Sequence, residues 1–140
     1  MLKITFVFLS LLFLVACTST SSTYSSADYH AALAMEYFKM GEKAKAYEKL
    51  QQALTQNPKS ISALLAMAYY LEKTGDDETA RRIYQQTLKL AAHAGAVLNN
   101  YGAFLCKNGN KQLGAYYLKQ AALSKKYPGL ETVKQNLEHC

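Results

Sequence analysis

The chain has 140 residues and carries 16 Lys and Arg against 10 Asp and Glu, which gives a net charge of +6. This length is enough for one small domain with a modest core. The three cysteines lack the paired spacing of a zinc site, no nucleic-acid recognition motif accompanies the positive charge, and no cofactor is expected.

The N-terminal segment has the pattern of a bacterial lipoprotein signal peptide. Lys3 precedes an apolar run over residues 4–15, which is shorter than the ~20 residues that span a bilayer. Leu14-Val15-Ala16-Cys17 then resembles the lipobox, in which the cysteine is diacylated and becomes the mature N-terminus. We expect residues 1–16 to be a signal peptide and Cys17 the lipid attachment site; the alternatives are an ordinary signal peptide or a permanent transmembrane helix.

An uncharged Ser/Thr-rich stretch follows the cysteine. Residues 18–26 contain nothing to bury except one tyrosine, so residues 17–27 are expected to be the lipidated cysteine and a flexible tether. Lipoproteins kept at the inner membrane usually have Asp after the cysteine, whereas this chain has Thr18. The expected location is therefore the outer membrane, with the chain anchored by lipid on the periplasmic face.

A turn recurs three times after the tether. Gly41, Gly75 and Gly109 are spaced by 34 residues, and a small residue stands seven positions before and five after each of them: Ala34, Ala68, Gly102, Ala46, Ala80 and Gly114. This period is the tetratricopeptide pattern, in which each repeat is a helix–turn–helix unit. The sequence predicts an all-α tetratricopeptide-repeat solenoid, with three helix pairs and the first helix of a fourth.

Helical spacing of apolar residues places the elements within the repeats. One domain over residues 28–140 is expected, with repeats at about 27–60, 61–94 and 95–128 and a partial repeat at 129–140. Asp28, Ser60, Asp76 and Asn110 are expected as N-caps, and the three turn glycines as left-handed residues after helices. The predicted helices are 28–40, 43–56, 61–74, 77–92, 96–108, 111–125 and 130–139.

The first helices of such pairs line the inner surface of the solenoid, mainly through the second, fifth, ninth and twelfth positions of each repeat. Those positions are Asp28, Ala31, Met35, Phe38, Ser62, Leu65, Tyr69, Glu72, Ala96, Asn99, Ala103 and Cys106. A groove of this mixed character suits a partner's helix or extended segment. The partner-binding groove is expected at Met35, Phe38, Leu65, Tyr69, Glu72, Asn99 and Ala103.

Positive charge is concentrated in the second half of the chain. No acidic residue occurs from Thr79 to Leu130, a stretch that contains Arg81, Arg82, Lys89, Lys107, Lys111, Lys119, Lys125 and Lys126. This asymmetry indicates an acidic partner surface or anionic lipid headgroups, or only a solvated face kept soluble by lysines.

Residues that could carry catalysis are scattered. His30, His93 and His139 stand apart from any carboxylate pair or nucleophile in a motif, so no catalytic residue and no enzyme activity are expected. The acidic run at residues 76–78 could be read as a metal cluster, but beside a helix N-terminus it complements the helix dipole. No metal site is expected there.

One segment of the third repeat is more specific than the repeat itself. Asn99-Asn100-Tyr101-Gly102-Ala103-Phe104-Leu105-Cys106 resembles a segment of the type IV pilus biogenesis and stability lipoproteins, the PilF/PilW family. Tyr127-Pro128 and the end of the chain, residues 136–140, are similar to its next stretch, with Glu138 in place of a glycine. The resemblance covers residues 14–140 and implies a member shortened at its C-terminus, because the chain ends within the first helix of a fourth repeat.

The resemblance implies a pilotin, an outer-membrane lipoprotein that helps a pilus secretin reach the outer membrane and form multimers. The alternative is a general tetratricopeptide scaffold lipoprotein of envelope assembly, which would bind another envelope protein. A disulfide between Cys106 and Cys140 is a further hypothesis for an oxidising compartment. Equivalent positions of neighbouring first helices lie too far apart for a disulfide, so this hypothesis depends on a shift of register around Tyr127-Pro128.

Overall fold

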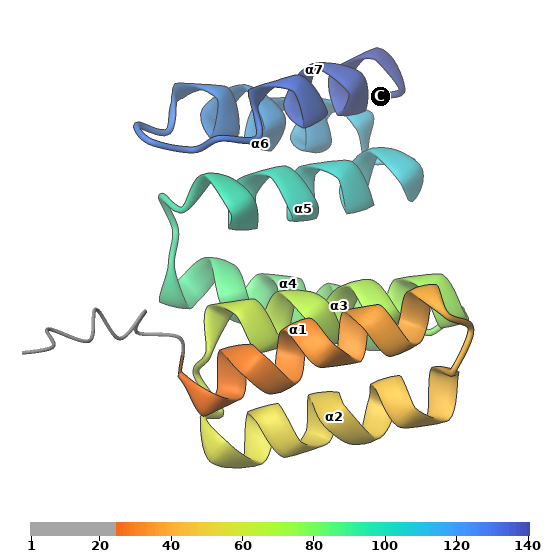
Figure 1. Cartoon of the computed structure of the whole chain (residues 1–140). Helices are drawn as coiled ribbons and strands as arrows, with labels where there is room; N and C mark the ends of the chain where they lie inside the picture. The colour runs from red at the N-terminus through yellow and green to blue at the C-terminus, as the bar shows by residue number, and fades with distance from the viewer. Residues whose placement is uncertain (1–24) are drawn as a thin grey trace, which may run out of the picture.

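The computed structural model describes residues 25–140, which form seven α-helices and no strand (Figure 1). Residues 1–24, with the expected signal peptide, Cys17 and most of the tether, lie outside the described part of the chain. Each predicted helix is present, with its bounds within two residues of the expected ones. The helices are α1 (Ser26–Lys39), α2 (Lys43–Gln56), α3 (Ile61–Thr74), α4 (Asp77–Leu90), α5 (Gly95–Lys107), α6 (Lys111–Leu123) and α7 (Leu130–Glu138).

The start of α1 differs from the expectation. Ser25 is the N-cap, and its hydroxyl accepts a hydrogen bond from the backbone N–H of Asp28, while the Asp28 carboxylate accepts from the backbone N–H of Ser25. Asp28 is therefore not the N-cap but the third helical residue of a capping box, which satisfies two otherwise unpaired amides at once. The helix thus begins inside the stretch that was assigned to the tether.

The other helix ends follow the expected turn chemistry. Side chains of Ser60, Asp76 and Asn110 accept hydrogen bonds from the amides of the first turns of α3, α4 and α6, so these three predicted N-caps are confirmed. The three turn glycines have positive φ, as at Gly75, where φ is 96°. This left-handed conformation costs glycine least, which explains why the turns recur with this residue.

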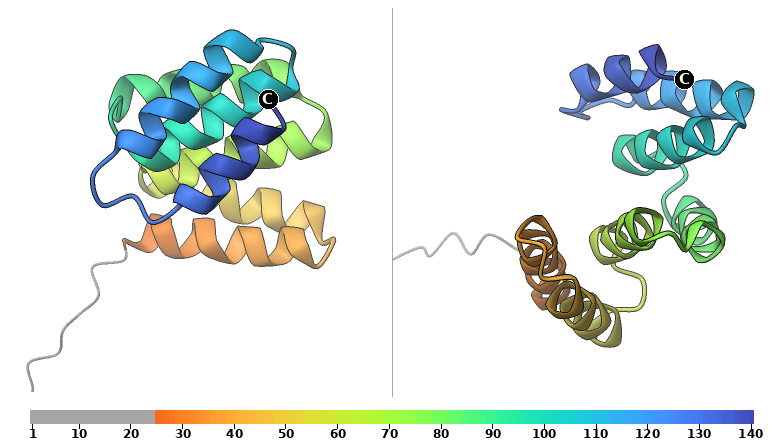
Figure 2. Two further views of the ribbon diagram at one scale, coloured as in Figure 1. Left: turned by 90° about the horizontal axis from the view of Figure 1, so that it is seen from above. Right: turned by 90° about the vertical axis from the view of Figure 1, so that its right-hand side faces the viewer.

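The seven helices form three helix pairs and one further helix, stacked side by side into a curved solenoid, and this confirms the predicted fold class (Figure 2). Successive first helices contact each other, α1 with α3, α3 with α5 and α5 with α7, whereas no contact joins α2 with α4 or α4 with α6. The stack therefore bends toward the first helices. We call the side formed by α1, α3, α5 and α7 the inner surface and the side formed by α2, α4 and α6 the outer surface.

Small residues allow the two helices of each pair to approach closely. Ala34, Ala46, Ala68 and Ala80 are fully buried in the first two pairs. The third pair is tighter still, because an added Cβ on Gly102 would lie 2.8 Å from Cγ of Leu118 and 2.9 Å from the backbone oxygen of Gly114. Glycine thus replaces alanine where the backbones of α5 and α6 are closest.

None of the helices in residues 25–140 is both long and apolar enough to cross a membrane.

Candidate partner-binding surface

The N-terminal half of the inner surface carries an aromatic cluster between α1 and α3. Phe38 stands edge-on to Tyr69 and Tyr70, with ring centroids 6.1 and 5.5 Å apart. Tyr69 is 38% exposed, and the ammonium group of Lys73 lies 5.1 Å from its ring centroid. Edge-on aromatic contacts and a cation over a ring stabilise the positions of these side chains, while Tyr69 stays partly accessible to solvent.

Met35 and Leu65 belong to the same face and are half-buried. Leu65 also packs against the main apolar cluster around Tyr84 and Phe104. The surface formed by Met35, Phe38, Leu65 and Tyr69 is therefore partly apolar, and Leu65 connects it to the core. Such a surface suits the binding of a protein segment. Its role in binding a partner stays a prediction.

Glu72 has a different environment from the one predicted. Its side chain is only 9% exposed and pairs with Lys107 at 3.1 Å, and it also accepts a hydrogen bond from the hydroxyl of Tyr84 at 3.2 Å. Burial, followed by the nearby Glu72 carboxylate, raises the pKa of Tyr84 far above its usual range. Glu72 thus joins α3, α4 and α5, and much of its hydrogen-bonding capacity is used inside the protein.

Asn99 does not line an open groove. It is 3% exposed, and its side-chain oxygen accepts a hydrogen bond of 3.0 Å from the amide of Asn136 on α7. Ala31 and Cys106, two further inner positions of the repeat pattern, are also buried. The expectation that Asn99 faces a partner is therefore wrong, because the next first helix, α7, covers it.

A hollow of about 330 Å³ marks the C-terminal half of the inner surface. It is lined by residues of α3, α5 and α7 and of the segment after α7, among them Glu72, Lys73, Ala103, Lys107 and His139. Ala103, predicted as a groove residue, thus forms part of its floor. Two lysines and one glutamate line this hollow, in contrast with the aromatic cluster nearer α1.

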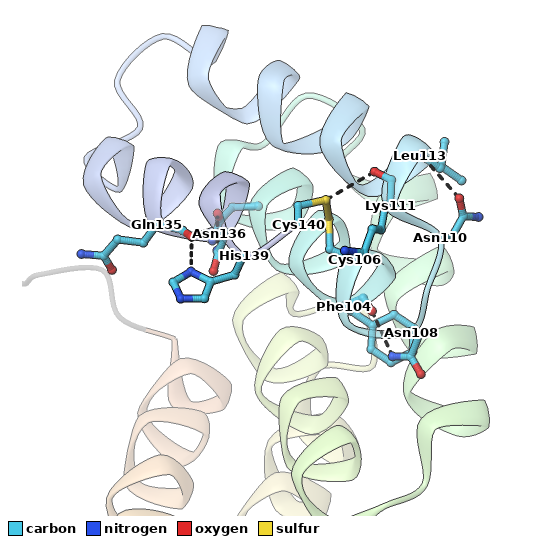
Figure 3. The surroundings of a disulfide bond; sticks show 11 residues. Phe104, Cys106, Asn108, Asn110, Lys111, Leu113, Gln135, Asn136, His139 and Cys140 are labelled. Carbon is cyan, nitrogen blue, oxygen red and sulfur yellow. Dashed lines mark hydrogen bonds between the residues drawn. A yellow bond between two sulfur atoms is a disulfide. The ribbon is translucent and has the colours of Figure 1, made fainter.

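A disulfide joins Cys106, in the last turn of α5, to Cys140, with a Cα–Cα distance of 4.9 Å (Figure 3). Cys140 lies beyond the end of α7, where the chain has turned back toward the start of α6 and the backbone oxygen of Lys111. Two equivalent helical positions would have been too distant. The separation is short because the second cysteine belongs to the segment after the helix.

Two lysines of this hollow, Lys73 and Lys107, were not predicted from the sequence to lie on the inner surface. Lys73 and Lys107 lie one position after Glu72 and Cys106 in the repeat pattern, and only their contacts with Tyr69 and Glu72 bring them to the inner surface. The lack of acidic residues from 79 to 130 was the available signal for Lys107.

Groups suited to metal binding are not assembled in this part of the chain. Within residues 25–140 no three His, Cys, Asp or Glu side chains converge where they could hold a metal ion. Asp76 instead caps α4, and the hydrogen bond from the backbone of Thr79 lowers the pKa of its carboxyl group. The ring nitrogen Nδ1 of His139 lies 2.6 Å from the backbone oxygen of Gln135.

Comparison with known proteins relates this arrangement to two groups of repeat proteins. A family model described as "Tetratricopeptide repeat" matches residues 27–60. A TPR repeat-containing protein of Methanocaldococcus jannaschii is 43% identical over 54 residues, which are 39% of this chain and 10% of that protein. This match reflects the repeat alone.

The longer matches are to type IV pilus proteins. The type IV pilus assembly protein PilF of Pseudomonas aeruginosa is 28% identical over 110 residues, which are 79% of this chain and 44% of PilF. A solved structure of PilF has a TM-score of 0.74 at 28% identity and covers 79% of this chain. The crystal structure of PilW, a type IV pilus biogenesis factor, has a TM-score of 0.77 at 24% identity over 81% of this chain.

This chain spans about half the length of the solved PilF and PilW chains, 50% and 52% respectively. The match to PilW, at 24% identity, supports the fold alone. The match to PilF is also found by comparison of the sequences, over 110 residues. The chain therefore has the tetratricopeptide-repeat fold and is homologous, at low identity, to tetratricopeptide proteins of type IV pilus biogenesis.

Proposed function

We propose that the protein is a scaffold of type IV pilus biogenesis whose inner surface binds a segment of a pilus secretin and promotes its localisation and multimerisation. The observation that carries the proposal is the similarity to PilF over 79% of this chain. The protein acts by binding rather than by catalysis, as a pilotin does.

The aromatic cluster supports this kind of partner. Phe38, Leu65 and Tyr69 offer apolar contact, and Lys73 adds a positive charge above one ring. A helix or extended segment with apolar anchors and a carboxylate matches this surface. Aromatic anchors at the centre of an interface often cost about 2 kcal/mol or more when truncated, so Tyr69→Ala should weaken secretin binding about thirtyfold.

The test combines deletion of the gene with restoration by variants. Loss of the gene should reduce secretin multimers in outer-membrane fractions, the native chain should restore them, and Tyr69→Ala should not. Tyr116→Ala is the matched control, because Tyr116 is an exposed tyrosine, 55% accessible, on the outer-surface helix α6. It should restore multimers as the native chain does.

Normal secretin multimers and pili in the deletion strain would reject the pilotin function. The general envelope scaffold would then be the better interpretation. Equal rescue by Tyr69→Ala and Tyr116→Ala would instead exclude the aromatic cluster as the binding site. Circular dichroism of both variants should show unchanged helix content, so that loss of contact is separated from loss of fold.

We further propose that the protein is a lipoprotein of the outer membrane, attached through Cys17. The lipobox-like segment and the short apolar run before it support the anchor, and two or more acyl chains suffice for stable attachment. Cys17→Ala should release the protein from membrane fractions. Radiolabelled fatty acid incorporated into that variant would contradict the assignment.

A further inference from the structure

Four segments of the chain meet at one end of the helical stack. They are the start of α1, residues 57–60 between α2 and α3, residues 91–94 between α4 and α5, and residues 124–129 between α6 and α7 (Figure 1). They share this end because first helices run away from it and second helices return to it. We call it the tether end, since the first described helix, α1, begins there.

The tether end presents unpaired positive charge. Lys59, Lys89, Lys125 and Lys126 are all exposed. None of these four ammonium groups forms an ion pair with another residue in 25–140, whereas Lys39, Lys45 and several other lysines do. Their field is therefore not neutralised by neighbouring carboxylates in the fold.

The carboxylates at this end are already engaged. Asp28 accepts hydrogen bonds from the hydroxyls of Ser60 and Ser62, and Glu131 pairs with Lys134 at 3.6 Å. From Thr79 to Leu130 the sequence contains no acidic side chain that could offset the lysines. The tether end is thus basic on balance.

The tether end also has exposed apolar side chains. Leu90, Leu123 and Leu130 are 42%, 74% and 48% exposed, at the last residues of α4 and α6 and the first residue of α7. A hollow of about 500 Å³ opens beside Leu123 and Lys125. Exposed leucines at the same end as exposed lysines have the composition of a surface that lies on a lipid headgroup layer.

We propose that the tether end docks on an anionic phospholipid bilayer, with the lysines at the headgroups and the leucines in the interfacial layer. Charge complementarity supports this partner, and so does the start of α1 at this end. If Cys17 is the anchor, Ser25 lies eight positions after it, and eight steps along the chain reach at most about 28 Å. The tether end is then the part of the fold held nearest to the membrane.

This orientation has a consequence for the inner surface. The helix axes point away from the membrane, so the inner surface opens sideways instead of toward the bilayer (Figures 1 and 2). A partner can therefore reach Phe38 and Tyr69 while the tether end stays docked. The inference does not depend on a secretin partner, and it uses the proposed anchor only for the direction of the membrane.

The test measures sedimentation of residues 18–140 with vesicles at low ionic strength. This part contains every described helix and the clusters that pack them, and circular dichroism with cooperative unfolding verifies its fold. We expect binding to vesicles of phosphatidylglycerol and phosphatidylethanolamine, and little binding to phosphatidylcholine alone. The double variant Lys125→Glu/Lys126→Glu should bind at least about thirtyfold more weakly, at about fivefold per lysine.

Two control variants have the same change of composition at the opposite end. Lys43→Glu/Lys111→Glu alters the net charge equally, and both lysines are exposed at the starts of α2 and α6; it should change affinity less than about threefold. Leu123→Ser should weaken binding about fivefold, whereas Leu113→Ser, in the first turn of the same helix, should have little effect.

Equal weakening by the two lysine pairs would overturn the proposal, because attraction would then follow net charge alone. Absence of binding to anionic vesicles would also overturn it and would leave an acidic protein as the partner of this end. Neither result bears on secretin multimers, which are measured separately with the full chain, so failure of the two proposals can be told apart.

Discussion

The side chain of Asn136 on α7 donates a hydrogen bond to the side-chain oxygen of Asn99 on α5 over 3.0 Å, at a position where Asn99 is 3% exposed. This pair is a polar contact inside the interface between the third helix pair and the last helix. Removing the donor leaves a buried oxygen without its partner, and such a loss costs about 1 to 3 kcal/mol.

Asn136→Ala is therefore expected to lower the free energy of unfolding by about 1 to 3 kcal/mol. Urea denaturation followed by circular dichroism measures this change. Lys134→Ala, on the same helix with an exposed side chain, should stay within about 0.5 kcal/mol of the native protein. Similar stability of the two variants would mean that the Asn99 oxygen is satisfied in another way.

The disulfide between Cys106 and Cys140 closes a loop with a sequence separation of 34. Loop-closure entropy predicts a contribution of about 3 to 4 kcal/mol for a loop of this size. We expect Cys106→Ala/Cys140→Ala in residues 18–140 to lower the free energy of unfolding by that amount. In urea denaturation, the midpoint of the double variant should therefore lie at a lower urea concentration than that of the native chain. Reductant should leave the urea midpoint of the double variant unchanged, whereas it should lower the midpoint of the native chain toward that of the variant. Two free thiols in protein taken directly from the periplasm would contradict the disulfide.

Gly114→Ala tests the close approach of α5 and α6. A Cβ at Gly114 would lie 2.8 Å from both the backbone nitrogen of Cys106 and the backbone oxygen of Gly102. Alanine normally favours a helix over glycine by about 1 kcal/mol, but overpacking against backbone costs about 1 to 3 kcal/mol. We expect net destabilisation in thermal melts. A higher melting temperature would show that the helices can separate at little cost.

Asp28, in the first turn of α1, should make a pH-dependent contribution to the free energy of unfolding. Hydrogen bonds from Ser62, then from Ser25 and Ser60, lower the pKa of the Asp28 carboxyl group. The folded pKa is below the unfolded value of about 3.9, so the stabilisation is complete above that value and is lost as the pH falls through the folded pKa. The difference in stability between the native chain and Asp28→Asn should therefore be constant near neutral pH and shrink below about pH 4.

The repeat architecture could be predicted because it depends on residues whose spacing is visible in the sequence. Glycines with positive φ and small residues at helix crossings recur every 34 residues, and each imposes a local requirement that few other residues meet. Ser60, Asp76 and Asn110 were identified as N-caps for the same reason. Asp28 was misassigned because Ser25, three residues earlier, offers the same chemistry, and the pattern does not say which of the two starts the helix.

The inner surface was less predictable because exposure depends on what the neighbouring helix covers. Of the predicted lining residues, Tyr69 is 38% exposed and Phe38 is half-buried beside it. Asn99 occupies the repeat position equivalent to that of Leu65, which is half-buried, yet α7 buries Asn99. The position in a repeat predicts that a side chain faces the inner surface. Whether that surface is exposed there depends on α7, through residues such as Asn136 and the turn around Tyr127, and these residues lie outside the regular period.

The disulfide also changes how the chain would respond to mechanical load. A pull between the N-terminal region and Cys140 would pass through the sulfur atoms and bypass the segment between the two cysteines. With a separation of 34 residues, roughly 120 Å of contour length at ~3.5 Å per residue would stay hidden while α1 to α4 extend. In single-molecule stretching, α6 and α7 would then contribute to the extension only after reduction.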